Sequence, residues 1–147
     1  MKNNMKKIIS VTIIIFILLL SVSCKDKTLE ETITSEVNNT MKVIINNHEY
    51  NVNLEDNQTT KELLNKLPLK LNMNELNGNE KYYYLDFALP TLPSNPKTIY
   101  AGDIMLYQNN CLVIFYKTFD TSYSYTKIGH IDNLEELNNN NITVEFK

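Results

Sequence analysis

Residues 102–119 read GDIMLYQNNCLVIFYKTF, and they contain the clearest β-hairpin signal in this chain. Two apolar segments, 104–107 and 111–117, flank the polar tripeptide 108–110, which predicts two antiparallel strands joined by a turn. The second segment is apolar on both faces, so we expect a central strand. Gly102-Asp103 predicts a turn that enters the first strand, because glycine accepts positive φ and aspartate binds nearby backbone N–H groups.

Shorter segments on both sides of this hairpin show the alternation of apolar and polar residues that is typical of half-buried strands. Asn46-Asn47 lies between two of them and predicts a second hairpin turn. Many short strands with few helices indicate a mostly β fold, either a closed β-barrel or a compact sandwich. The further predicted strands are residues 41–45, 50–54, 69–73, 122–128 and 142–146.

Residues 56–66 are predicted to form the main helix, because leucines gather there at helical spacing and Pro68 follows them. Either Asp56 or Thr59 is expected to cap its first turn. Residues 134–137 are predicted to form a second, short helical turn.

Two polar segments carry no signal for regular structure. Residues 76–81 are expected to form a loop around Gly78. The asparagine run at 138–141 is interpreted as compositional drift within another polar loop.

The N-terminal segment predicts the protein's location. Residues 1–7 carry three lysines and no acid, residues 8–20 are almost wholly apolar, and the small residues 21–23 precede Cys24. This order is typical of a secretory signal, and the cysteine directly after it resembles a bacterial lipoprotein signal. We expect removal of residues 1–23, lipidation of Cys24 and anchoring on the extracytoplasmic face of the bacterial cell membrane. An uncleaved membrane anchor is the alternative, although a spanning helix needs about 20 apolar residues.

Composition limits what the mature protein can do. Residues 24–40 are polar and predict a flexible tether, which leaves residues 41–147 as one domain. The mature chain has 11 lysines against 17 acids, and this negative charge argues against a nucleic-acid partner. If Cys24 is lipidated, Cys111 has no disulfide partner, so we expect it to be a buried and inert strand residue. We expect no metal and no cofactor, because no metal-ligand spacing or glycine-rich phosphate loop is present. We also expect the protein to be a monomer.

Four stretches carry a resemblance to a known family. They read LLNKLPL (63–69), GNEKY (78–82), GDIMLY (102–107) and CLVIFYKTF (111–119), the last followed by SYSYT (122–126). Together they resemble the bacterial cyclophilin-like domain family, small β-barrels often found on secreted or lipid-anchored proteins, from residue 41 to residue 147. The resemblance implies a closed barrel of about eight strands with one or two short helices, and it implies no established activity.

The same resemblance raises the question of prolyl isomerisation, whose barrier is about 18–20 kcal/mol. True cyclophilins lower that barrier with an apolar cleft and an arginine, and lysine is a poor substitute for a guanidinium group. This chain contains no arginine and no tryptophan. We therefore expect a non-catalytic binding module. The alternative is a divergent prolyl isomerase that uses a lysine or backbone donor, with Lys117 as the first candidate.

Clustered aromatic residues suggest where a ligand would bind. Most of them are expected to pack in the core or at the wet edge of a barrel. A functional interpretation is a shallow aromatic cleft for a peptide or small molecule, walled by residues 82–84 and 119–125, with a few polar groups. A third possibility is an accessory subunit that docks on another membrane protein through a flat apolar patch. The candidate ligand-binding residues are Asn79, Glu80, Tyr84, Lys117, Phe119, Tyr123 and Tyr125.

Overall fold

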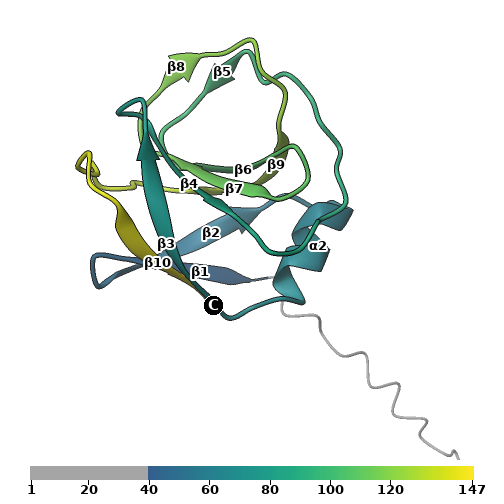
Figure 1. Ribbon diagram of the computed structural model, residues 1–147, viewed down its shortest axis with the longest axis horizontal. Coiled ribbons are helices and arrows are strands. Elements are labelled where there is room, and N and C mark those ends of the chain that lie inside the picture. The colour runs from purple at the N-terminus through teal and green to yellow at the C-terminus, as the bar shows by residue number, and fades with distance from the viewer. Residues whose placement is uncertain (1–39) are drawn as a thin grey trace, which may run out of the picture. The chain divides into compact units, whose positions relative to one another are not determined.

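The structure is a computed structural model, and it describes residues 40–147. The predicted signal peptide, Cys24 and the tether up to residue 39 lie outside the described residues. Eight antiparallel strands close into a barrel in the order β1-β10-β3-β4-β7-β6-β9-β2 (Figure 1). The predicted mostly β fold with a closed barrel is therefore confirmed. These strands are β1 (Met41–Ile45), β2 (His48–Leu54), β3 (Leu69–Leu76), β4 (Glu80–Tyr84), β6 (Asp103–Tyr107), β7 (Cys111–Phe115), β9 (Thr126–Ile131) and β10 (Ile142–Phe146).

The hairpin of β6 and β7 forms as predicted, with Tyr107 paired to Cys111 beside the turn. Every residue of β7 is buried, which confirms its central position between β4 and β6. Gly102 has φ of 100°, and Asp103 Oδ2 accepts a hydrogen bond from the Tyr100 N–H at 2.9 Å. The predicted role of Gly102-Asp103 as a turn that enters a strand is thereby confirmed.

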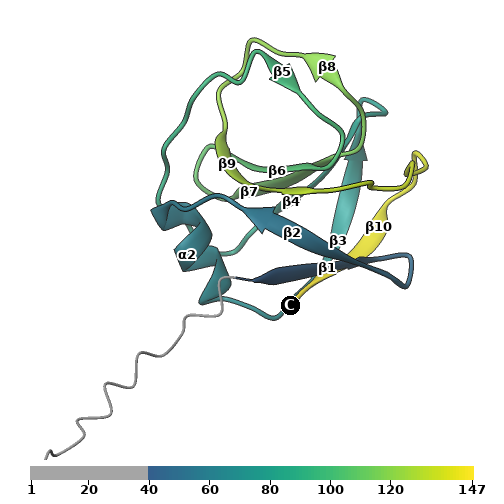
Figure 2. The same cartoon turned by 180° about the vertical axis from the view of Figure 1, so that it is seen from behind.

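Side-chain alternation along the strands separates an inner core from an outer one. Most of the inward-facing residues are apolar and buried, as are Leu112 and Ile114 of β7. The alternate residues of β6 and β7 face outward and pack under the two-stranded sheet of β5 (Thr98–Ile99) and β8 (Phe119–Asp120). Figure 2 shows β5 and β8 set apart from the barrel strands. The outer core is built from Ile99, Met105, Cys111, Val113, Phe115 and Tyr125.

The helix α2 (Gln58–Leu64) is shorter than predicted, and both predicted caps are wrong. Asn57 is the N-cap, because its extended backbone lets Oδ1 accept a hydrogen bond from the Thr60 N–H at 2.9 Å. Asp56 pairs instead with Lys61 at 2.7 Å, and the Thr59 hydroxyl donates to Pro90 O at 2.7 Å. Within residues 40–147, no helix is long and apolar enough to cross a membrane.

The second predicted helical turn, at residues 134–137, does not form. Leu137 is buried in the inner core, while its neighbours Glu135 and Glu136 are exposed. Leu134 is partly buried against the same core, so burial of the two leucines holds this segment without helical hydrogen bonds.

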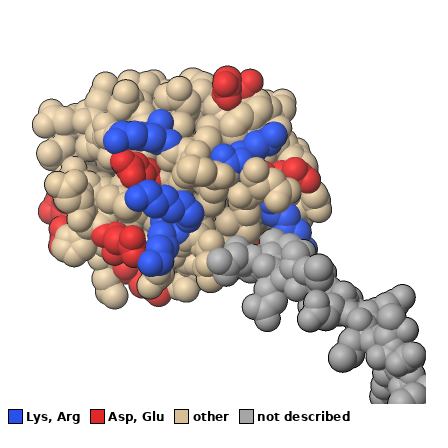
Figure 3. Space-filling view, turned by 90° about the horizontal axis from the view of Figure 1, so that it is seen from below, with Lys and Arg blue, Asp and Glu red and all other residues tan. Residues whose placement is uncertain are grey.

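Lysines and carboxylates lie side by side on the face of the domain shown in Figure 3. On the outer barrel surface, Lys42 Nζ lies 2.6 Å from a Glu49 oxygen, and Lys70 Nζ lies 2.8 Å from a Glu145 oxygen. Exposed pairs of this kind contribute little to stability. The absence of a nucleic-acid partner stays a prediction.

Candidate functional site

A cavity of about 460 Å³ opens on the outer side of the barrel, between β4, β6 and β7 and the segment 119–125. Seven residues were candidates from the sequence, and six of them lie in its lining. Lys117 does not: it is exposed, and its Nζ lies 5.8 Å from the centre of the Tyr116 ring. The six lining residues are Asn79, Glu80, Tyr84, Phe119, Tyr123 and Tyr125.

Strand geometry explains why these residues meet. Along β4, Glu80, Tyr82 and Tyr84 point outward because successive side chains of a strand alternate between its two faces. Tyr84 is paired with Cys111 of β7, which is in turn paired with Tyr107 of β6. The three strands therefore present a continuous row of outward side chains to the cavity.

The cavity has an apolar floor and an aromatic rim. Cys111, Val113 and Tyr125 are buried at its base, whereas Tyr84 and Tyr123 are more than half exposed. The ring of Tyr107 packs edge-on against that of Tyr123, with centroids 6.2 Å apart. Such contacts hold the loop 119–125 against the sheet and so fix the rim.

The charge in the cavity is negative. Glu80 and Asp120 line it, and no lysine, arginine or histidine does so among the described residues. Burial, followed by the nearby Glu75 carboxylate, raises the pKa of Glu80. Burial and the charge of Glu80 also raise the pKa of Tyr125 to about 12, so its hydroxyl stays neutral at physiological pH.

Two polar atoms of the lining differ in what they offer a ligand. Cys111 is buried as predicted, and this burial raises the pKa of its thiol to about 11, which leaves almost no nucleophilic thiolate. Asn79 Oδ1 is buried and has no hydrogen-bond partner within residues 40–147. A donor group on a ligand would satisfy that oxygen, which is costly to leave without a partner.

The model for the cyclophilin-like family matches residues 43–147, which covers the barrel and the cavity. The chain belongs to the cyclophilin-like family. This result confirms the resemblance seen in the sequence. No curated protein and no solved structure matches the chain.

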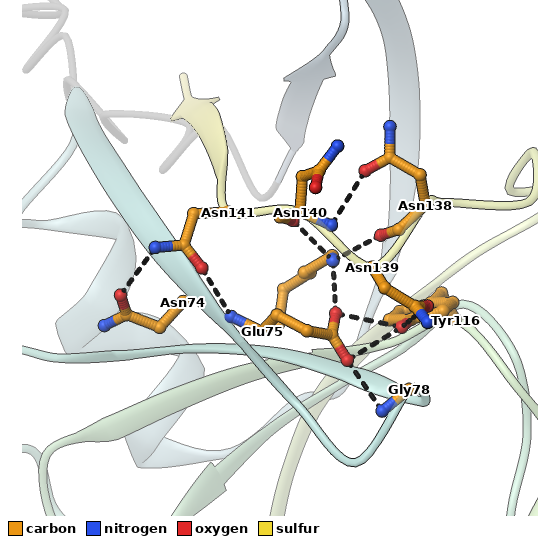
Figure 4. A network of polar contacts seen from close by, with 9 residues as sticks. Asn74, Glu75, Gly78, Tyr116, Asn138, Asn139, Asn140 and Asn141 are labelled. Atoms are coloured by element: carbon orange, nitrogen blue, oxygen red, sulfur yellow. Dashed lines mark hydrogen bonds and ion pairs between the residues drawn. The ribbon is translucent and has the colours of Figure 1, made fainter.

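The cyclophilin-like barrel also contains a buried lysine that the sequence analysis missed. Lys81 is fully buried, and its Nζ binds the Glu75 carboxylate and the carbonyl oxygens of Asn138 and Asn140, the latter two at 2.6 and 2.7 Å. Figure 4 shows the Glu75 carboxylate between Tyr116 and Gly78. The loop expected at 76–81 is shorter in the structure, because β3 runs to Leu76 and β4 starts at Glu80, and only residues 77–79 form the turn around Gly78.

The asparagine run 138–141 is likewise more than compositional drift. Its backbone carbonyls bind Lys81, and the Asn141 side chain accepts a hydrogen bond from the Glu75 N–H at 3.0 Å. The spacing of Glu75 and Lys81 around Gly78 was a signal for this cluster. A hairpin turn at Gly78 makes those two residues cross-strand partners.

A second polar cluster of the cyclophilin-like domain lies outside the cavity lining. His130 Nδ1 is 2.9 Å from Asp103 Oδ1, and the other oxygen of that buried carboxylate holds the turn at Tyr100. These contacts join β9 to the start of β6. Within the described part of the chain, no group of three or more His, Cys, Asp and Glu residues could hold a metal ion.

Proposed function

We propose that this chain is a lipid-anchored, extracytoplasmic binding module whose outer cavity takes a peptide or a small molecule without transforming it. The observation that carries the proposal is the cavity itself. Its volume, about 460 Å³, falls in the range of ligand sites, and it combines a buried apolar floor with an aromatic rim and few polar groups.

The anchor part of the proposal rests on the sequence of residues 1–24. Two signals are needed for stable anchoring, and the lipid chains on a lipoprotein cysteine supply them. We expect the native protein to sediment with membranes and to take up radiolabelled palmitate. Substitution of the cysteine, Cys24→Ala, should abolish the label and release the protein from membranes. Retention of the label in the variant would contradict lipidation at Cys24.

The non-catalytic part of the proposal rests on the chemistry of the lining. A prolyl isomerase without arginine would place a lysine or backbone donor beside the substrate carbonyl, and Lys117, the candidate lysine for that role, lies outside the cavity lining. The isomerase alternative thus has no positively charged side chain among the described lining residues.

Ligand binding can be tested with the full chain in dodecyl maltoside micelles. Tyrosine rings labelled with ¹³C report on the cavity through Tyr84 and Tyr123, and elsewhere through Tyr100. A fragment library and short peptides that contain Ala-Pro should include compounds that shift the first two signals and leave Tyr100 unchanged. Exchange spectra of the Ala-Pro bond, recorded in the same samples, should show no acceleration.

A matched pair of variants provides the control. Tyr84 and Tyr100 are almost equally exposed, at 59% and 57%, but only Tyr84 lines the cavity. Tyr84→Ala should weaken binding of any compound found, while Tyr100→Ala should leave it unchanged. If no library member shifts the cavity signals selectively, or if both variants behave alike, the cavity is not a ligand site. Accelerated exchange would favour the isomerase instead.

A further inference from the structure

The cavity lining has an unusual combination of side chains. Six aromatic residues and two carboxylates line it, and none of its described lining residues carries a positive charge. Aromatic faces carry a negative quadrupole, and carboxylates carry a full negative charge. Both attract cations and repel anions. The aromatic residues are Tyr82, Tyr84, Tyr107, Phe119, Tyr123 and Tyr125.

Glu80 is the first residue of β4, and its side chain faces the cavity without a hydrogen-bond or ion-pair partner among the described residues. Within residues 40–147 its carboxylate forms no hydrogen bond and no ion pair, although it is half-buried. Asp120, by contrast, accepts a hydrogen bond from the Thr98 hydroxyl at 2.8 Å. A half-buried carboxylate without a counter-charge is unfavourable, so this position favours a cation supplied from outside the domain.

The nearest lysine along the chain cannot supply that cation. Lys81 follows Glu80 directly, but strand alternation turns it to the opposite face of β4. There its Nζ is engaged by Glu75, Asn138 and Asn140. Lys81 is therefore bound inside the barrel, and it cannot neutralise Glu80 on the cavity side.

We propose that the cavity binds an alkylammonium group, with the cation held between the tyrosine rings and the Glu80 carboxylate. The inference rests on the proposed function, because it names the class of ligand for the same cavity. A cation over aromatic rings is attracted by their negative faces, and desolvation by the surrounding rings strengthens its attraction to a carboxylate. The ammonium group can belong to a small free cation or to a lysine side chain of a peptide.

Matched probes separate the charge of a ligand from its shape. Choline and 3,3-dimethyl-1-butanol have the same shape and differ in a single central atom, which is N⁺ in one and carbon in the other. Nα-acetyl-lysine amide and Nα-acetyl-norleucine amide form a second, peptide-like pair. Each is titrated into the full chain in dodecyl maltoside micelles, with the labelled rings of Tyr84 and Tyr123 as reporters and Tyr100 as the reference.

We expect at least one cation to bind about tenfold more tightly than its neutral partner. Glu80→Gln should remove most of that advantage and leave the neutral compound unaffected. Asp86→Asn removes the same charge from an exposed position outside the lining, so it should change nothing. Tighter binding of choline would indicate a small cation, and tighter binding of the lysine derivative would indicate a peptide.

Several results would overturn the inference. Equal binding of cation and neutral partner would show a ligand site without selection for charge. Failure of both cations at about 50 mM, while library fragments still shift Tyr84 and Tyr123, would reject the ammonium and retain the proposed function. An equal effect of Asp86→Asn and Glu80→Gln would reject Glu80 as the group that holds the cation. If neither the library nor the cations bind, both proposals fail together.

Discussion

Glu75 on β3 and Lys81 on β4 are direct cross-strand partners, and their side chains form an ion pair on the inner side of the barrel. The same carboxylate accepts hydrogen bonds from the Tyr116 hydroxyl at 2.9 Å and from the Gly78 N–H at 2.7 Å. Lys81 extends the cluster to the backbone of residues 138–140. The pair therefore joins the β3–β4 turn, the end of β7 and the segment before β10.

Lys81→Met should lower the free energy of unfolding by about 3–5 kcal/mol, because it leaves a largely buried carboxylate without its cation. Urea unfolding followed by circular dichroism measures the change. Lys42→Met breaks an exposed ion pair with Glu49 and should cost less than about 1 kcal/mol. Addition of Glu75→Leu to Lys81→Met should restore part of the loss. A loss in Lys81→Met as small as that in Lys42→Met would mean that the pair contributes little to folding.

Acid should weaken the protein through Glu75. Burial alone would raise the pKa of this carboxyl, but its bonds to Lys81, Tyr116 and Gly78 outweigh burial and lower the pKa below 4.5. Between the folded pKa and 4.5, the unfolded chain binds more protons than the folded one. The stabilisation is therefore complete above about pH 4.5 and is lost as pH falls through the folded pKa.

The measurement for this effect is the unfolding free energy from about pH 7 to about pH 3, for the native protein and Glu75→Gln. The native protein should be the more stable of the two at neutral pH, and their difference should shrink below about pH 4.5. Parallel curves for the two proteins over the whole range would exclude Glu75 as the titrating group.

Gly102→Ala should destabilise the protein by about 3 kcal/mol or more. Gly102 has φ of 100°, and a Cβ there would lie 2.2 Å from the backbone oxygen of Ile131, which cannot move without disturbing β9. Gly78→Ala is the matched control, since its φ is also positive at 69° but its nearest neighbour is a side chain 3.9 Å away. That variant should lose only about 1–2 kcal/mol. Similar thermal midpoints for the two variants would contradict the close approach at Gly102.

Cys111 should resist alkylation in the folded protein. Burial raises the pKa of its thiol to about 11, and the thiolate is the reactive form. Iodoacetamide at about pH 7.5 should modify the native chain at least about a hundredfold more slowly than the urea-unfolded chain, as followed by intact mass. Cys111→Ser supplies the blank for this assay. Equal rates in the native and unfolded states would show that the thiol at the cavity floor is open to reagents.

Much of the fold could be predicted because its signals are local. The apolar character of β7 on both faces follows from five consecutive residues, and β7 is buried on both faces in the barrel. Aromatic clustering likewise pointed to Tyr84, Tyr123 and Tyr125 as neighbours in space, and the cavity brings them together. Lys117 does not line the cavity, although it was predicted to do so. Strand β7 ends at Phe115, so the alternation of side chains that would turn Lys117 toward the cavity does not extend to it.

The sequence by itself determined the mostly β fold, the central hairpin and the turn at Gly102, because hydrophobic alternation and glycine conformation act over a few residues. Only the tertiary structure determined that Lys81 is buried and which groups it binds, because its carbonyl partners are 57 and 59 residues further along the chain. A sequence pattern reports which side chains avoid water, but it does not report which distant backbone atoms will meet them. The closure of the barrel brings those atoms together, and it leaves Glu80 facing the cavity with its neighbouring lysine committed to the interior.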